Sequence, residues 1–270
     1  MTQPFRFFSA KYFPKPQKLI AGAYHLKSDC EIVKLAFIRS VLNKDDIAID
    51  VGAYIGFYTQ LMSQYVGNKG RVLAYEPNPY IFRVLRRLIK KQSNISAWQR
   101  AVSEQSNHRL AMKLHPYSLK TNSTVELKLM GKERMRGWSK NVDVQTEALN
   151  DLCRTLSSPI AFIKIDAQGH EYEVLKGADK LIEKDLPPLL CKYTFEAGVF
   201  EPQTPSLLKE YGYECYDIGM LKSFEKAPNS PYETNLIAIP KERRPEYQEK
   251  LSMLTRLFSP HCLASIHHFL

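Results

Sequence analysis

One acid and two glycines early in the chain are spaced as they would be in a site that binds a nucleotide-like cofactor. Asp50 lies in an apolar run, residues 47–51, which has the length of a buried strand. Gly52 and Gly56 follow, and residues 57–66 form an apolar-rich segment of helical length. A strand, a glycine turn and a helix in this order let the backbone approach a ligand closely and direct N–H donors at it.

The spacing of these residues distinguishes between cofactors. A dinucleotide site reads G-x-G-x-x-G, whereas here the two glycines have three residues between them. Asp50 beside the turn would repel a pyrophosphate, but it suits a cofactor that carries an ammonium and a sulfonium group. A second apolar run, 71–75, ends in Glu76, where a carboxylate can hold a ribose diol. The glycines alone would also fit a tight turn before a core helix, but with both acids the pattern favours S-adenosylmethionine over NAD.

A third acid follows another buried strand. Residues 160–165 are apolar except for Lys164 and lead to Asp166, and an amphipathic helix follows. Apolar strands alternate with helices from residue 45 to 240, which predicts an α/β Rossmann-like, doubly wound, seven-stranded sheet, mostly parallel with an antiparallel final strand. Alternating segments near 107–141 predict a β-rich insertion. Ligands of such sheets bind beyond the carboxyl ends of the strands, and four predicted strand ends carry candidate residues: Asp50, Glu76, Ala101-Val102 and Asp166.

Length and composition fit one large domain with extensions. The chain has 270 residues, of which 44% are apolar and 24% charged. We expect residues 1–44 to form an N-terminal extension and helix that acts as a lid or edge cover, 45–240 to form the domain, and 241–270 to form a C-terminal tail. The five cysteines include no C-x-x-C pair, and we find no signal peptide or bilayer-spanning run, so we expect a reduced, cytoplasmic protein.

The chain is basic, with a formal net charge of +10. Such a surplus can indicate binding to nucleic acid or to an anionic membrane. The densest cluster, 83–91, has helical spacing after Pro79, and we expect its basic side to be a solvated helix face. The apolar residues that we expect on the opposite, buried side are Ile81, Phe82, Val84, Leu85, Leu88 and Ile89.

Several of these segments, taken together and in order, resemble the FkbM-type methyltransferases, a branch of the class I S-adenosylmethionine-dependent fold. The resemblance covers roughly residues 45–240 and rests on 50–59, 74–79, 101–103, 163–171, 174–178 and 235–240. It implies methyl transfer, in most members onto a hydroxyl of a sugar or a secondary metabolite. The cofactor-binding residues that it implies, together with the strand ends, are Asp50, Gly52, Ala53, Tyr54, Gly56, Tyr58, Thr59, Glu76, Pro77, Ala101, Val102 and Asp166.

The chain departs from the family pattern at three places. The family usually has Asn at the position of Tyr54, so contacts to the amino-acid end of the cofactor are expected to differ. It usually has Glu at the position of Gln168, and the loss of that carboxylate argues against a metal site. It also commonly carries a Glu near Lys192, whereas the nearest one here is Glu196.

The expected chemistry needs few groups. A sulfonium methyl is already activated, so transfer depends mainly on holding the acceptor atom close and aligned. An alcohol acceptor must also lose its proton, and His170 is our first candidate for the base because histidine titrates near neutrality. A role as a helix cap is the alternative for His170. Asp166 could orient that base or bind the acceptor, and Glu171 could pair with Lys164 in a purely structural role.

Other functions stay open on the sequence alone. They are N-methylation of a small or macromolecular acceptor, cofactor binding without turnover, and a dehydrogenase with an atypical glycine turn. The Asn/Asp-Pro-Pro-Tyr motif of base amino-methylation is absent, and residues 166–169 stand in its place. We therefore expect a small-molecule or sugar acceptor and no nucleic-acid partner, and the sequence leaves a homodimer open.

Overall fold

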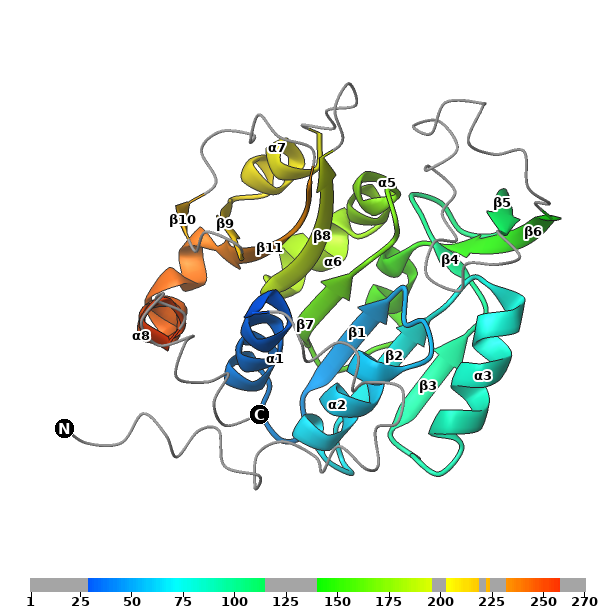
Figure 1. Cartoon of the computed structure of the whole chain (residues 1–270), viewed down its shortest axis with the longest axis horizontal. Coiled ribbons are helices and arrows are strands. Elements are labelled where there is room, and N and C mark those ends of the chain that lie inside the picture. Colours follow the sequence, from blue (N-terminus) through cyan, green and yellow to red (C-terminus); the bar gives the residue numbers. More distant parts are fainter. Residues whose placement is uncertain (1–28, 115–139, 196–202, 219–221, 224–231, 258–270) are drawn as a thin grey trace.

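The computed structural model describes residues 29–114, 140–195, 203–218, 222–223 and 232–257. Within these ranges a central β-sheet is covered by helices on both faces (Figure 1). The helices are α1 (Asp29–Val41), α2 (Phe57–Val66), α3 (Pro79–Ile89), η5 (Leu149–Arg154), α5 (Glu171–Lys176), α6 (Asp179–Asp185), α7 (Gln203–Glu210), η6 (Lys241–Arg243) and α8 (Arg244–Leu257). The strands are β1 (Ile47–Val51), β2 (Arg71–Tyr75), β3 (Ile95–Trp98), β4 (Ala101–Val102), β5 (Arg109–Leu114), β6 (Lys140–Glu147), β7 (Ile160–Ile165), β8 (Leu189–Phe195), β9 (Tyr213–Asp217), β10 (Lys222–Ser223) and β11 (Tyr232–Pro240).

The main sheet has the order β10-β9-β11-β8-β7-β1-β2-β3. Strands β3, β2, β1, β7 and β8 pair in parallel, and β11 runs antiparallel to both β8 and β9. The predicted seven-stranded, mostly parallel sheet with an antiparallel final strand is confirmed. The two-residue strand β10 extends it at the β9 edge, and β11 lies between two strands rather than at the edge.

Strand β1 shows why the central strands read as continuous apolar runs. Ile47, Ile49 and Val51 pack with α5 and α6, whereas Ala48 packs with α1 and α2 on the opposite face. All five residues of β1 are buried because helices cover both faces. Helices α1, α2, α3 and α8 lie on one face, and η5, α5, α6 and α7 lie on the other.

The predicted β-rich insertion is confirmed for the part that the structure describes. Strands β4, β6 and β5 form a separate three-stranded sheet, in which β5 pairs antiparallel with β6. Ala101, Met112 and Val144 form its buried core. The strand that the alternation of residues 124–129 indicates lies outside the described residues.

The described parts of the two flanking segments pack with the sheet. Helices α1 and α8 bury apolar side chains, among them Phe37 and Leu254, in the same cluster as α2 and five strands. The division of the chain at residues 44 and 240 remains a prediction. None of the helices in the described ranges is both long and apolar enough to cross a bilayer.

Candidate active site

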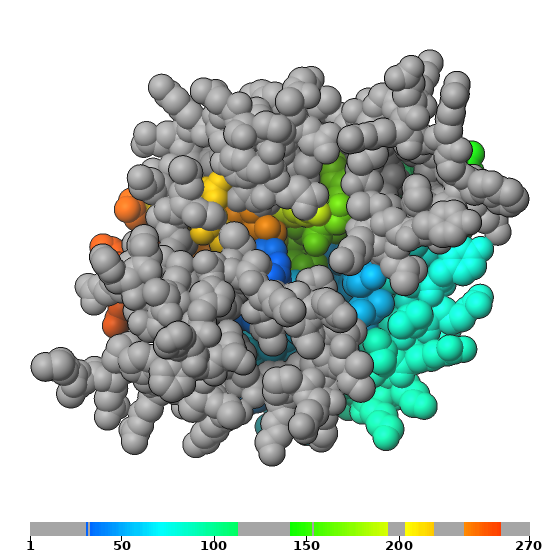
Figure 2. Space-filling model, viewed as in Figure 1, coloured from blue at the N-terminus to red at the C-terminus, as the bar shows by residue number. Residues whose placement is uncertain are grey.

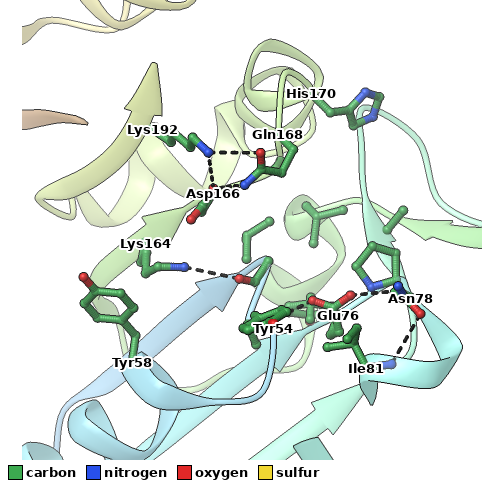
Figure 3. A pocket seen from close by; sticks show the side chains of 18 of the residues that line it. Tyr54, Tyr58, Glu76, Asn78, Ile81, Lys164, Asp166, Gln168, His170 and Lys192 are labelled. Atoms are coloured by element: carbon green, nitrogen blue, oxygen red, sulfur yellow. Dashed lines mark hydrogen bonds and ion pairs between the residues drawn. The ribbon is translucent and has the colours of Figure 1, made fainter. Parts of the chain in front are cut away.

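A cavity of about 410 Å³ opens at the carboxyl ends of β1, β2 and β7. Its volume lies within the range of small-molecule sites. The glycine turn after β1, the segment after β2, the loop after β7 and the insertion sheet all contribute to its wall (Figure 3). Parallel strands place their carboxyl ends at the same edge, which is why motifs far apart in sequence meet here.

Glu76, at the end of β2, forms one corner of the cavity. Its two carboxylate oxygens accept backbone N–H bonds from Tyr54 at 2.9 Å and from Asn78 at 2.8 Å. Burial raises the pKa of the Glu76 carboxyl to about 7, although the two backbone donors oppose the rise. Each oxygen keeps a lone pair that a ribose hydroxyl can use, so this corner fits the diol of a nucleoside.

An apolar wall continues from this corner. Its members are apolar and come from the segment after β2, from α3 and from the insertion sheet: Pro77, Ile81, Ala101, Val102, Met112 and Val144. An apolar surface beside a carboxylate that can accept hydroxyls is chemically suited to an adenine ring. The insertion sheet therefore completes the site through Met112 and Val144.

Asp50 does not face the cavity, contrary to the prediction. Strand register places it beside Lys164 of β7, and its carboxylate accepts hydrogen bonds from Lys164 Nζ at 2.9 Å and from Thr59 Oγ1 at 2.6 Å. Asp50 and Thr59 are fully buried and both lie behind the cavity wall, which Lys164 itself lines. Burial would lower the pKa of the Lys164 ammonium, but Asp50 and Asp166 raise it, so the lysine stays charged.

The two glycines of the motif serve backbone packing. A Cβ at Gly52 would lie 1.9 Å from the carbonyl oxygen of Asp166, and φ is 73° there. Gly56 is the N-terminal cap of α2 with φ of 92°, and a Cβ on it would meet Leu85 at 2.5 Å. Gly52 lines the cavity and Gly56 does not. Close approach of the turn after β1 to the backbone of Asp166 is enough to demand glycine at residue 52.

A polar network joins the end of β7 to the middle of β8. The Gln168 side chain donates to Asp166 Oδ1 at 3.0 Å and accepts from Lys192 Nζ at 3.0 Å, and Lys192 lies 3.6 Å from Asp166 (Figure 3). Burial would raise the pKa of the Asp166 carboxyl, but Lys164, Lys192 and Lys34 together lower it. Asp166 is therefore an anion at neutral pH, and all three members of the network line the cavity.

His170 lines the cavity but has different partners from Asp166. Its Nε2 lies 3.0 Å from Ser103 Oγ, and its Nδ1 lies 3.4 Å from a carboxylate oxygen of Glu173. In Figure 3 the ring lies away from the Asp166 network, so Asp166 does not orient it. Burial lowers the pKa of His170, although Glu173 opposes this. His170 occupies the N-cap position before α5, but its side chain makes no capping hydrogen bond, so the alternative role as a side-chain cap is not seen.

Glu171 does not pair with Lys164, contrary to the interpretation from the sequence. Its carboxylate accepts the backbone N–H groups of Ala167 at 2.9 Å and of Gly169 at 2.8 Å. It thereby fixes the loop in which Gln168 has a positive φ of 53°. Burial, and then the charge of Asp166, raise the pKa of Glu171 to about 8.

Helix α1 contributes two cavity residues that the sequence analysis missed. The Tyr58 hydroxyl donates to Glu31, which also pairs with Lys34, and all three line the cavity. Lys164 and Lys192 were missed as well, although a lysine inside an apolar strand is a detectable signal. No sequence signal marked Glu31 and Lys34, because only the packing of α1 against α2 brings them to the cavity.

Most of the predicted site residues meet in this cavity. Those that line it are Gly52, Ala53, Tyr54, Tyr58, Glu76, Pro77, Ala101, Val102, Asp166 and His170. Those that do not are Asp50, Gly56 and Thr59, and Glu196 lies outside the described residues. Among the described residues, no group of three or more His, Cys, Asp and Glu could hold a metal ion.

The parallel sheet with an antiparallel strand, the glycine turn after β1 and the acid after β2 define an S-adenosylmethionine-dependent methyltransferase. Residues 50–215 match the family model described as "Methyltransferase FkbM domain", which covers more than half of the chain. The chain therefore belongs to the FkbM methyltransferase family, and S-adenosylmethionine is its cofactor.

Two named relatives and one solved structure accompany this match. "Methyltransferase sdnD" of Sordaria araneosa is 28% identical in an alignment of 199 residues that covers 64% of this chain and 75% of the relative. "Hexuronic acid methyltransferase AglP" of Haloferax volcanii is 24% identical over 178 residues, 65% of this chain and 67% of the relative. The crystal structure of "Methyltransferase FkbM" from Methylobacillus flagellatus KT has a TM-score of 0.45 at 15% identity, covering 83% of this chain and 58% of that one.

Proposed function

We propose that this methyltransferase transfers the methyl group to a hydroxyl of a sugar or of a related secondary metabolite. The observation that carries the proposal is the division of the cavity into two chemically different parts. The Glu76 corner and its apolar wall suit a nucleoside, whereas Asp166, Gln168 and Lys192 present charged and amide groups on the side of β7 and β8 (Figure 3). The hexuronic acid in the name of one relative agrees with a polar, hydroxylated acceptor.

The first part of the cavity would hold the cofactor, which supplies a methyl group already activated by the positive sulfur. Glu76 would accept the ribose hydroxyls, and the apolar wall with Ile81 and Met112 would cover the base. Lys164 and the Glu31–Tyr58 pair also line the cavity, and these charged and polar groups can fix the amino-acid end of the cofactor. These residues would orient the cofactor and exclude water from it.

The second part would bind the acceptor. Asp166 can accept a sugar hydroxyl, and Lys192 and Gln168 can donate to hydroxyl oxygens, since all three line the cavity. We assign proton removal to His170, whose lowered pKa keeps the ring neutral at neutral pH. The acceptor hydroxyl would replace Ser103 as the partner of Nε2.

A product analysis with uronic acids and their glycosides tests the type of acceptor. The enzyme is incubated with S-adenosylmethionine and each sugar, and the product is examined by mass spectrometry before and after mild alkali. A methyl ether survives alkali and supports the proposal. A methyl ester, which alkali removes, or an N-methylated product would contradict transfer to a hydroxyl.

The base is tested by His170→Asn, with His108→Asn as the control because His108 is exposed outside the cavity. We expect His170→Asn to lower kcat by about 100-fold or more, the usual size of a general-base contribution, with cofactor affinity unchanged. Since the base acts when deprotonated, the wild-type rate should fall as pH drops through a pKa below that of an ordinary histidine. An equal loss in both variants, or a pH dependence that persists in His170→Asn, would refute this role.

A further inference from the structure

The outer face of α3 differs from what its sequence pattern predicts. Val84 and Leu88 were expected on the buried side of this helix, but the structure leaves them 40% and 45% exposed. Tyr80 is 49% exposed, and these three are the only large hydrophobic side chains that are exposed in the part of the chain that the structure describes. They recur every fourth residue, so they form one continuous stripe along α3, here called the α3 stripe.

The stripe is separate from the face that holds α3 on the sheet. Ile81, Leu85 and Ile89 are buried, and the latter two pack against the sheet in one small cluster, which secures the helix without the stripe. Figures 1 and 2 show α3 at the edge of the molecule, with its outer side open in this view. Isolated exposed apolar residues are ordinary, whereas a stripe of all three on one helix indicates a surface that something covers.

Positive charge accompanies the stripe. Residues 77–103 contain six Lys or Arg residues and no Asp or Glu, and five of the six fall on α3 or directly after it: Arg83, Arg86, Arg87, Lys90 and Lys91. The four that precede Lys91 are exposed. At the C-terminal end of α3, Lys91 lines a depression together with Lys44 and Lys69. The partner of this surface must therefore be anionic and must also accept aliphatic side chains.

From this pairing of an apolar stripe with an acid-free basic flank, we infer that α3 is a docking surface for an anionic lipid bilayer. A helix of this kind lies in the interface plane, with its apolar residues among the acyl chains and its basic residues at the lipid phosphates. A nucleic acid would satisfy the cations but would leave Val84 and Leu88 without apolar contacts. In a two-fold symmetric dimer through this face, the basic residues of the two copies would face and repel one another.

Docking through α3 would also place the active site at the membrane surface. Asn78 caps α3 and, with Ile81, lines the cavity, and Tyr80 begins the stripe next to them. The cavity therefore opens beside the end of the docking surface. The inference does not depend on the identity of the acceptor, because lipid binding can be measured without turnover.

Sedimentation of the full chain with vesicles tests this inference. We expect binding to phosphatidylcholine vesicles that contain about 30% phosphatidylglycerol, little binding to pure phosphatidylcholine, and weaker binding as salt is raised from about 0.1 M to about 0.5 M. Val84→Ser combined with Leu88→Ser should reduce the partition coefficient by about tenfold or more. Arg83→Gln combined with Arg87→Gln should reduce it about fivefold for each charge removed.

Lys180→Gln combined with Lys184→Gln is the matched charge control. Both lysines are exposed on α6, on the opposite face of the sheet, and their removal should leave vesicle binding unchanged. Unchanged binding of S-adenosylhomocysteine by every variant establishes that each is folded. Equal binding to both vesicle types, or full binding by the Val84/Leu88 variant, would overturn the inference. So would tighter binding to a DNA duplex than to the anionic vesicles, or a dimer in solution that this variant dissociates.

Discussion

The proposed contact of Glu76 with the ribose would link cofactor binding to pH, and the structure allows the size of the effect to be worked out. Its carboxyl is buried with a pKa of about 7 in the free protein, compared with an ordinary value of 4.5. Ribose hydroxyls would donate to the carboxylate, so they stabilise the ionised form and lower the pKa on binding. Cofactor binding should therefore release a proton near pH 7, and affinity should rise with pH.

The magnitude follows from the fraction of Glu76 that is ionised. With a pKa of about 7, that fraction changes about tenfold between pH about 6 and pH about 8, so the Kd should be about tenfold higher at the lower pH. Glu76→Gln removes the titrating carboxyl group. It also places the side-chain N–H₂, a donor, opposite a backbone N–H that needs an acceptor. We expect it to cost about 1–3 kcal/mol of binding free energy, with a flatter pH dependence.

Titration calorimetry with S-adenosylhomocysteine, in buffers that differ in ionisation enthalpy, measures both the Kd and the number of protons released. Glu147→Gln is the control, because Glu147 is a half-buried carboxylate that accepts the Tyr75 hydroxyl and does not line the cavity. It should retain the pH dependence of the wild type. If Glu76→Gln binds as tightly as the wild type, or shows the same pH dependence, Glu76 does not hold the ribose.

Three further predictions concern stability, measured by urea denaturation. Lys164→Met leaves Asp50 buried without its cation and should cost about 3–5 kcal/mol, most of which Asp50→Asn should restore in the double variant; no restoration would argue against the pair. Gly52→Ala sets a Cβ 1.9 Å from a backbone oxygen and should cost more than about 3 kcal/mol, whereas Gly212→Ala, with a similar φ and open space, should cost about 1–2 kcal/mol. The pKa of Glu171 is raised to about 8, so the folded protein should lose stability as pH rises from about 4.5 to about 8, and Glu171→Gln should flatten that slope; an unchanged slope would contradict it.

The cofactor half of the site could be predicted from the sequence because its parts are local. A strand, a turn and a helix within twenty residues have few ways to pack, and an acid at the end of a parallel strand lies at the binding edge. This reasoning put Glu76, Gly52 and Tyr54 at the binding edge, and all three line the cavity. The alternation of strands and helices predicted the sheet for the same reason, since each element's pattern reports which faces are buried.

The direction of two charged side chains depended on partners that the sequence pattern does not identify. Asp50 was expected to face the cofactor, but β1–β7 register sets it beside Lys164, 114 residues away, and a buried pair is satisfied only when its two members meet. The Glu171 carboxylate turns toward the loop that precedes α5 rather than toward Lys164, since two backbone N–H groups of that loop lie within reach.

The sequence by itself determined that the chain builds a doubly wound sheet with a glycine turn at the binding edge, because periodicity and turn chemistry are local properties. Only the tertiary structure decided which surfaces stay exposed and which helices reach the cavity. Leu88 reads as a core residue in the helical pattern, yet β3 is the last strand of the sheet and covers only part of α3. Helix α1 reads as an extension, yet packing against α2 brings Glu31 to Tyr58. Exposure and proximity depend on what the rest of the chain covers, and no single segment contains that information.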